Sequence, residues 1–193
     1  MSSCRISMLA AVLAATSALG GCSTSSGDPT TSGDPPPPDA GKPSALFTCE
    51  ETDLAPLSFS GPGFDKSTGH FTGAQQATCL VHTTWLETRK GHESAFFKLT
   101  GAVIGRLQAQ PGLLGYSLAT SKKCGTARTM GVWRDQKSVD AFVVSKEHAA
   151  AMAAVDDVAT DYATYVWEQA LDGTPPSWPD VVKQLRDHQE VAQ

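Results

Sequence analysis

The sequence lacks the features typical of proteins that bind nucleic acids, bind metal ions or cross a membrane several times. It has no basic cluster, and 20 aspartates and glutamates outnumber 15 lysines and arginines, for a net charge of −5. Nucleic acid is therefore not an expected partner. The five cysteines include no Cys-x-x-Cys and no metal-ligand spacing, which argues against zinc or redox chemistry. Beyond the N-terminal region, no apolar run reaches the roughly 18 residues of a membrane-spanning helix.

The N-terminus carries the pattern of an export signal. Arg5 precedes an apolar run at residues 8–15, and small residues then lead to a cysteine. The sequence Leu19-Gly20-Gly21-Cys22 resembles the bacterial lipoprotein signal, in which the cysteine is acylated, for example with palmitate. The resemblance implies that residues 1–21 are a signal peptide. It also implies a lipid on Cys22 that anchors the protein to a membrane of the cell envelope, facing the periplasm or exterior. An ordinary signal peptide that happens to contain a cysteine is the alternative.

Two segments separate this signal from the part of the chain with clear periodicity. Residues 22–44 are rich in serine, glycine and proline and hold no core-forming residue, so we expect a tether. Residues 45–76 place leucines and phenylalanines among glycines and prolines. We expect these residues to form a largely irregular extension, with one short strand, packed on the domain.

Residues 77–171 show the periodicity of one domain, and residues 172–193 add a C-terminal helix and tail. Strands are predicted at 77–88, 115–120, 126–133 and 161–171, and helices at 92–110, 136–144 and 145–155. This β-α-β-β-α-β order predicts an α+β, ferredoxin-like antiparallel sheet with helices on one face. The predicted strands have large apolar residues at both odd and even positions, so both faces of the sheet are apolar. The face without helices therefore also needs to be covered. A second copy of the chain, in a homodimer, is the simplest one.

Three motifs in this region suggest a family. The stretches Pro111-Gly112-Leu113-Leu114-Gly115-Tyr116, Gly131-Val132-Trp133-Arg134-Asp135 and Phe142-Val143-Val144-Ser145-Lys146-Glu147-His148 resemble the antibiotic biosynthesis monooxygenase-like family. The resemblance covers residues 77–170 and implies a dimeric α+β barrel. The family includes cofactor-free quinone-forming monooxygenases and haem-degrading oxygenases. At the positions that match the haem-degrading branch, this chain has Thr84, Phe142 and Met152 instead of asparagine, tryptophan and histidine. We therefore expect no haem and no other cofactor.

A cofactor-free monooxygenase needs a dry pocket, an oriented aromatic or quinone-type substrate and a proton acceptor. His148 and His82 are the candidate catalytic residues, because histidine titrates near neutral pH. Each has a purely structural alternative: His148 closes a helix N-terminus, and His82 is a satisfied interior or interface histidine. The candidate pocket residues, which could equally be core, are Trp85, Phe96, Tyr116, Trp133, Phe142 and Met152. A non-catalytic small-molecule-binding or structural module is the alternative function.

The cysteines left after lipidation of Cys22 allow one disulfide. If the first and third strands of the fold run parallel and adjacent, Cys79 and Cys124 lie close together, so we predict Cys79–Cys124. Cys49–Cys124 is the rival pairing, with the extension joined to the domain.

Overall fold

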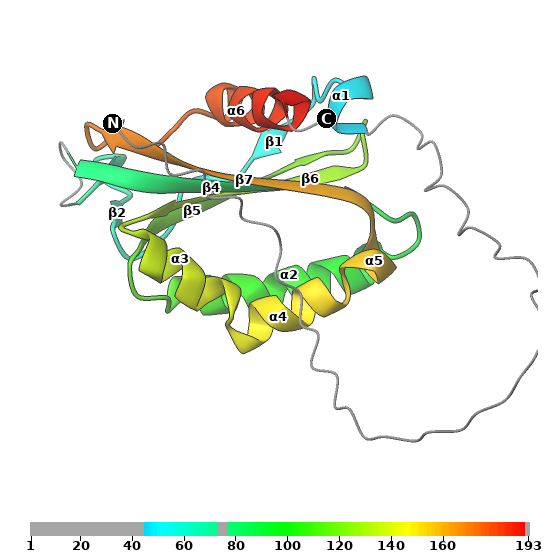
Figure 1. Ribbon diagram of the computed structural model, residues 1–193, viewed down its shortest axis with the longest axis horizontal. Helices are drawn as coiled ribbons and strands as arrows, with labels where there is room; N and C mark the ends of the chain where they lie inside the picture. The colour runs from blue at the N-terminus through cyan, green and yellow to red at the C-terminus, as the bar shows by residue number, and fades with distance from the viewer. Residues whose placement is uncertain (1–44, 73–76, 192–193) are drawn as a thin grey trace, which may run out of the picture. The chain divides into compact units, whose positions relative to one another are not determined.

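The computed structural model describes residues 45–72 and 77–191, so the predicted signal peptide, Cys22 and the tether lie outside the described residues (Figure 1). No helix in these two ranges is long and apolar enough to cross a membrane. The elements predicted between residues 77 and 171 are present with nearly the predicted bounds. In chain order, the elements are α1 (Ala45–Thr48), β1 (Ala55–Pro56), β2 (Phe64–Asp65), β3 (His70–Phe71), β4 (Ala77–Thr88), α2 (Glu93–Gln108), β5 (Leu113–Ser121), β6 (Thr126–Trp133), α3 (Gln136–Val143), α4 (Lys146–Ala153), α5 (Val155–Val158), β7 (Ala159–Leu171) and α6 (Trp178–Val191).

The main sheet has five strands in the order β1-β5-β6-β4-β7, and every neighbouring pair is antiparallel. Its four long strands and the helices between them follow the predicted β-α-β-β-α-β order, which confirms the α+β ferredoxin-like fold. β4 lies between β6 and β7. Because side chains alternate along a strand, this interior strand sends residues to both faces of the sheet.

Helices α3 and α4 each begin with a side-chain cap. At the start of α3, the Asp135 carboxylate accepts the backbone N–H of Ser138 at 2.8 Å. At the start of α4, the Ser145 hydroxyl accepts the backbone N–H of His148 at 3.4 Å. Side-chain acceptors at this position satisfy N–H groups that have no partner within the helix. The second cap places His148 in the first turn of α4.

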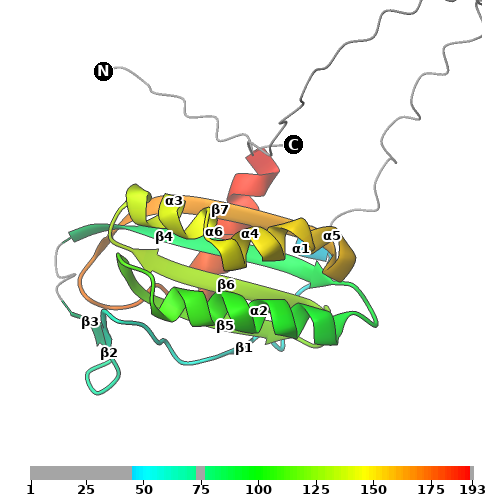
Figure 2. The same ribbon diagram turned by 90° about the horizontal axis from the view of Figure 1, so that it is seen from below.

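Helices α2 to α5 cover one face of the sheet (Figures 1 and 2). Burying a large apolar side chain stabilises a fold by about 1.5–3 kcal/mol. A core cluster therefore holds α2 and α3 to the strands, and its buried members are Leu80, Leu107, Leu113, Tyr116, Trp133, Val139 and Phe142.

The opposite face of the sheet is covered by other parts of the same chain. Helix α6 lies over it in Figure 1, and two of its residues, Val181 and Leu185, are completely buried. Val181 packs with Val81 and Met130 of the sheet. Leu185 packs with Trp85.

The extension covers the rest of this face and is more ordered than expected. Instead of one short strand, it forms a one-turn helix and three two-residue strands, of which β1 pairs with β5 and becomes an edge of the main sheet. The rings of Phe59, Phe64 and Phe71 lie 5.4–5.7 Å apart, centroid to centroid. Phe71 is 1% exposed and packs in a cluster with Val132 and Leu171.

The sequence argument for a homodimer assumed that this face needs a second subunit to cover it. That assumption is wrong, because α6 and the extension already bury the face. Val81, Met130 and Val132 are each 0% exposed within one chain. A homodimer is therefore not required to complete the core.

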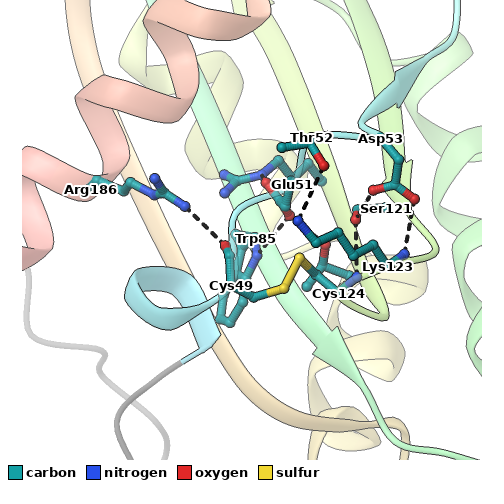
Figure 3. The surroundings of a disulfide bond; sticks show 11 residues. Cys49, Glu51, Thr52, Asp53, Trp85, Ser121, Lys123, Cys124 and Arg186 are labelled. Carbon is teal, nitrogen blue, oxygen red and sulfur yellow. Dashed lines mark hydrogen bonds and ion pairs between the residues drawn. A yellow bond between two sulfur atoms is a disulfide. The ribbon is translucent and has the colours of Figure 1, made fainter.

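The disulfide prediction Cys79–Cys124 is wrong. Cys124 bonds to Cys49, with Cα atoms 5.8 Å apart, and Cys79 is a buried free thiol (Figure 3). The error lies in the strand direction, because β4 and β6 are antiparallel and Glu87, not Cys79, pairs with Thr126 beside Cys124. Eight residues of strand, roughly 27 Å at 3.4 Å per residue, separate Cys79 from that end of β4. The rival pairing, which joins the extension to the β5–β6 turn, is the one formed.

Candidate functional site

His82 lies on β4, on the face covered by helices, opposite Gly131 of β6 and Val166 of β7. Its Nε2 atom is 3.0 Å from the Thr164 hydroxyl. That hydroxyl donates its one hydrogen to the Thr83 carbonyl at 3.0 Å, so it accepts from His82. The hydrogen-bond pattern therefore assigns the Nε2–H tautomer to neutral His82 and leaves the lone pair of Nδ1 available.

The environment keeps His82 uncharged. Burial, with a smaller contribution from the positive charge that His148 can carry, lowers the pKa of His82 to about 4. The ring is half-buried, and the loss of part of its hydration disfavours the imidazolium form. At neutral pH, His82 is therefore an acceptor through Nδ1, but it is a weak base.

His148 has the complementary arrangement. Its Nδ1 lies 3.0 Å from the Val143 carbonyl, which can only accept, so Nδ1 carries the hydrogen and Nε2 has the free lone pair. Burial lowers the pKa of His148, and the bond to Val143 opposes part of this effect. The ring also contacts Phe142, with the ring centroids 4.8 Å apart.

An unpaired donor lies next to these rings. The indole of Trp133 is 1% exposed and packs on Phe142, with ring centroids 5.3 Å apart. Its Nε1–H is buried and forms no hydrogen bond to the described residues. The indole lies over Gly131, where an added Cβ would be only 2.7 Å from Nε1. We call His82, His148, Trp133, Phe142 and Thr164 the histidine site.

The other predicted pocket residues are not all brought to this site. Tyr116 belongs to the same core cluster, and its hydroxyl accepts a hydrogen bond from Gln108 at 3.1 Å. Phe96 packs in a separate cluster under α2, and Met152 is 42% exposed. Trp85 is a correction: it lies on the opposite face of the sheet, where its indole N–H donates to Glu51. It cannot line a pocket with His82, because positions 82 and 85 differ in parity along one strand.

The structure also places on this face three threonines to which the sequence analysis gave no role in the site. The hydroxyls of Thr84 and Thr129 lie 2.5 Å apart on neighbouring strands, and Thr164 supports His82. The alternation of residues 82 and 84 along β4 was the available signal for Thr84. Thr129 and Thr164 become neighbours of β4 only through strand pairing.

Two cavities in the described part of the chain, of about 360 and 390 Å³, are lined by neither His82 nor His148. The first lies at the end of α2, around Gln110 and Gly112. The second lies between residues 50–56 and α6. Within residues 45–72 and 77–191, no group of three or more histidines, cysteines or carboxylates is placed to hold a metal ion.

Residues 80–154 match the model of the antibiotic biosynthesis monooxygenase family, and this stretch contains both histidines. No curated protein matches the chain. Among solved structures, the chain is similar to a candidate antibiotic biosynthesis monooxygenase from Nitrosomonas europaea. The identity is 14% and the TM-score 0.47, and the match covers 52% of this chain and 97% of that chain. It is also similar to Rv0793 from Mycobacterium tuberculosis, with 21% identity, a TM-score of 0.44, and coverage of 51% and 96%. The fold assignment rests on the chain's own strand order.

Proposed function

We propose that this chain is an envelope lipoprotein whose domain oxidises a small phenol or hydroquinone with molecular oxygen, without a cofactor. The observation that carries the proposal is a pair of neutral imidazoles, His82 and His148, each with one free ring nitrogen, beside an aromatic wall. The match of residues 80–154 to a monooxygenase family supports the same class of chemistry.

The reaction needs only the substrate and oxygen. A base takes the phenolic proton, and the electron-rich phenolate reduces oxygen at a ring carbon, where a C–O bond replaces a C–H bond. The O–O bond then breaks, and the second oxygen atom leaves as water. For hydroquinone, C₆H₆O₂ and O₂ give hydroxybenzoquinone, C₆H₄O₃, and H₂O. The substrate supplies all four electrons, so no reduced nicotinamide is consumed.

The two histidines have different roles in this proposal. His148 is the base, because the Val143 carbonyl favours its protonated form and offsets part of the effect of burial. A general base works best with a pKa near the working pH, and the pKa of about 4 makes His82 too weak. His82 orients the substrate by accepting a hydrogen bond at Nδ1. The unpaired indole N–H of Trp133 donates to a substrate oxygen.

Oxygen uptake with a panel of hydroquinones tests the enzyme proposal. We expect uptake by the wild type and a fall in kcat/KM for His148→Ala of at least about 100-fold, as for the loss of a general base. His82→Ala loses one hydrogen bond and should lower kcat/KM by roughly tenfold. His92→Ala, an exposed site before α2, is the control and should match the wild type. No uptake by the wild type across the panel would refute the enzyme proposal, and unchanged uptake by His148→Ala would refute the role of that residue.

A non-catalytic binding module is the second candidate, and it is favoured by the two cavities, because neither is lined by the histidines. Hydroquinone-induced shifts in NMR spectra at Gly112 or Trp178, which line the two cavities, without oxygen uptake would establish this candidate. A lack of shifts at both cavities would argue against a binding module at these positions.

The lipid anchor is proposed on the sequence of residues 1–22 alone. Metabolic labelling with palmitate should mark the wild type, and Cys22→Ser should abolish the label and release the protein from the membrane fraction. A wild type that is unlabelled and soluble would favour an ordinary signal peptide.

A further inference from the structure

Two arginines, Arg128 and Arg186, lie on the side of the sheet opposite the histidine site. Each has buried N–H groups that form no hydrogen bond with the described residues. Arg128 of β6 is 1% exposed, and its Nε donates to Glu51 at 2.6 Å. Both of its Nη atoms are buried without a hydrogen-bond partner among the described residues. Arg186 of α6 donates from Nη2 to the Cys49 carbonyl at 3.2 Å, and its buried Nε also lacks a partner there. Buried polar groups are almost always paired, so these three atoms point to a missing acceptor.

The carboxylate that pairs with Arg128 accepts hydrogen bonds through both of its oxygens. The Oε2 atom of Glu51 accepts from Arg128, and its Oε1 accepts from the Trp85 indole at 3.2 Å and from the Thr126 hydroxyl. Burial lowers the pKa of Arg128, Glu51 raises it, and the positive charge of Arg186 lowers it further. The two guanidinium groups thus repel each other, and together with Glu51 they leave an excess of one positive charge.

A cavity of about 390 Å³ adjoins this group, between residues 50–56 and α6. Arg186 and Glu51 are among its lining residues, whereas Arg128 lies behind Glu51 and does not line it; Figure 3 shows Arg186 reaching from α6 towards Cys49. Its apolar lining includes Leu54, Pro56 and Trp178. The volume lies within the range of about 300–1,000 Å³ typical of small-molecule sites, which combine apolar walls with a few polar groups.

We propose that this cavity binds a monoanionic organic carboxylate, with the carboxylate against Arg186 and the apolar body against Trp178. One negative charge neutralises the excess of one, and a guanidinium matches a carboxylate in geometry. The apolar wall favours a carboxylate with an aromatic or aliphatic body over inorganic phosphate. Glu50 also lines the cavity but is exposed, so its charge is screened by water. The site is independent of the proposed oxidation, because the sheet separates it from the histidine site.

The four tryptophans report where a ligand binds. Trp178 lines the cavity and donates to the Ser117 hydroxyl at 3.2 Å, whereas Trp133 lies on the opposite face of the sheet. We expect benzoate, added to the protein with its disulfide intact, to shift the Trp178 indole N–H signal in NMR spectra and to leave Trp133 in place. Benzamide, the uncharged analogue, and inorganic phosphate should each bind at least tenfold more weakly than benzoate.

Substitutions on α6 supply matched variants. Arg186→Gln should weaken benzoate binding at least tenfold, and Arg186→Lys, which keeps the charge, should weaken it less. Lys183→Gln changes an exposed residue of the same helix that pairs with Asp187, and should bind as the wild type does. The set of four indole signals shows whether each variant is folded.

Three results would overturn the proposal: no shift at Trp178, a shift at Trp133 instead, or equal binding of benzoate by a folded Arg186→Gln protein. A phosphate affinity equal to that of benzoate would overturn the assignment to organic carboxylates. None of these outcomes depends on oxygen uptake, so failure here is distinguishable from failure of the proposed oxidation.

Discussion

The chemical properties of each face of the sheet depend on single residues, and in each case a neighbouring residue determines the protonation or the pairing of that residue. His82 is neutral because the packing around this half-buried ring removes part of its hydration, and Thr164 decides which ring nitrogen keeps the hydrogen. Arg128 is held by Glu51, a residue of the extension, 77 positions away in the sequence. The sequence contains these residues, but their pairing depends on contacts between segments that are distant along the chain.

The lowered pKa of His82 predicts a pH dependence of stability. Between its ordinary value of 6.5 and about 4, the unfolded chain binds a proton that folded His82 does not bind. The free energy of unfolding must therefore fall as the pH drops through this window. We expect His82 to contribute a loss of about 1–2 kcal/mol between pH 7 and pH 5, measured by urea denaturation.

His82→Gln is the matched variant for this measurement, because it keeps a donor for Thr164 but cannot titrate. Its loss of stability over the same range should be smaller than that of the wild type. His148 contributes in the same direction, so some dependence remains. The carboxylates of Asp53 and Asp135, whose pKa values are lowered, stay ionised at pH 5. Identical curves for the wild type and His82→Gln would show that burial does not shift the pKa.

At the scale of elements, the extension behaves as part of the domain. It adds β1 to the sheet edge, supplies Glu51 beneath α6 and joins the β5–β6 turn through Cys49–Cys124. Asp53 strengthens the same junction, because its carboxylate accepts the backbone N–H of Lys123 at 2.9 Å. A segment held at so many points stabilises the face that it covers.

The disulfide should account for a measurable part of this stability. Cross-linking residues 75 positions apart restricts the unfolded chain, so the double variant Cys49→Ser/Cys124→Ser should lose about 2–4 kcal/mol in urea denaturation. Peptide mapping without reduction should recover Cys49 joined to Cys124. Cys79 should react with iodoacetamide only after denaturation, because it is 3% exposed and burial raises its pKa. A Cys79–Cys124 peptide would contradict the fold described above.

On the scale of the whole molecule, α6 takes the place that a second subunit was expected to fill. We therefore predict that the full chain is a monomer in sedimentation velocity experiments. A chain ending at residue 173 lacks α6 and exposes Val81 and Met130, so it should dimerise or aggregate. A chain ending at residue 189 keeps Val181 and Leu185 and should remain monomeric. A dimeric full chain that is unchanged by loss of α6 would contradict this prediction.

Much of the fold could be predicted because local signals and tertiary packing agree. The strand predicted at 77–88 matches β4, and the strand predicted at 126–133 matches β6, because β-branched and aromatic residues lie between clear turns. Asp135 and Ser145 mark true helix starts because each accepts an N–H within its own first turn. The extension was harder to predict, since its two-residue strands exist only through pairing with β5 or with each other.

The candidate site could be predicted only in part. His82, Trp133, Phe142 and His148 are brought together, but Trp85 was assigned to the wrong face although its odd spacing from His82 excluded a shared pocket. The sequence by itself determined the α+β class. Each helix or strand can be recognised from its hydrophobic period and its capping residues, which depend on a few neighbouring residues, and the order of these elements defines the class. The tertiary structure alone decided the disulfide, the cover of the second face and the partners of each buried charge. These depend on strand direction and on which distant segments meet, and no local pattern records them.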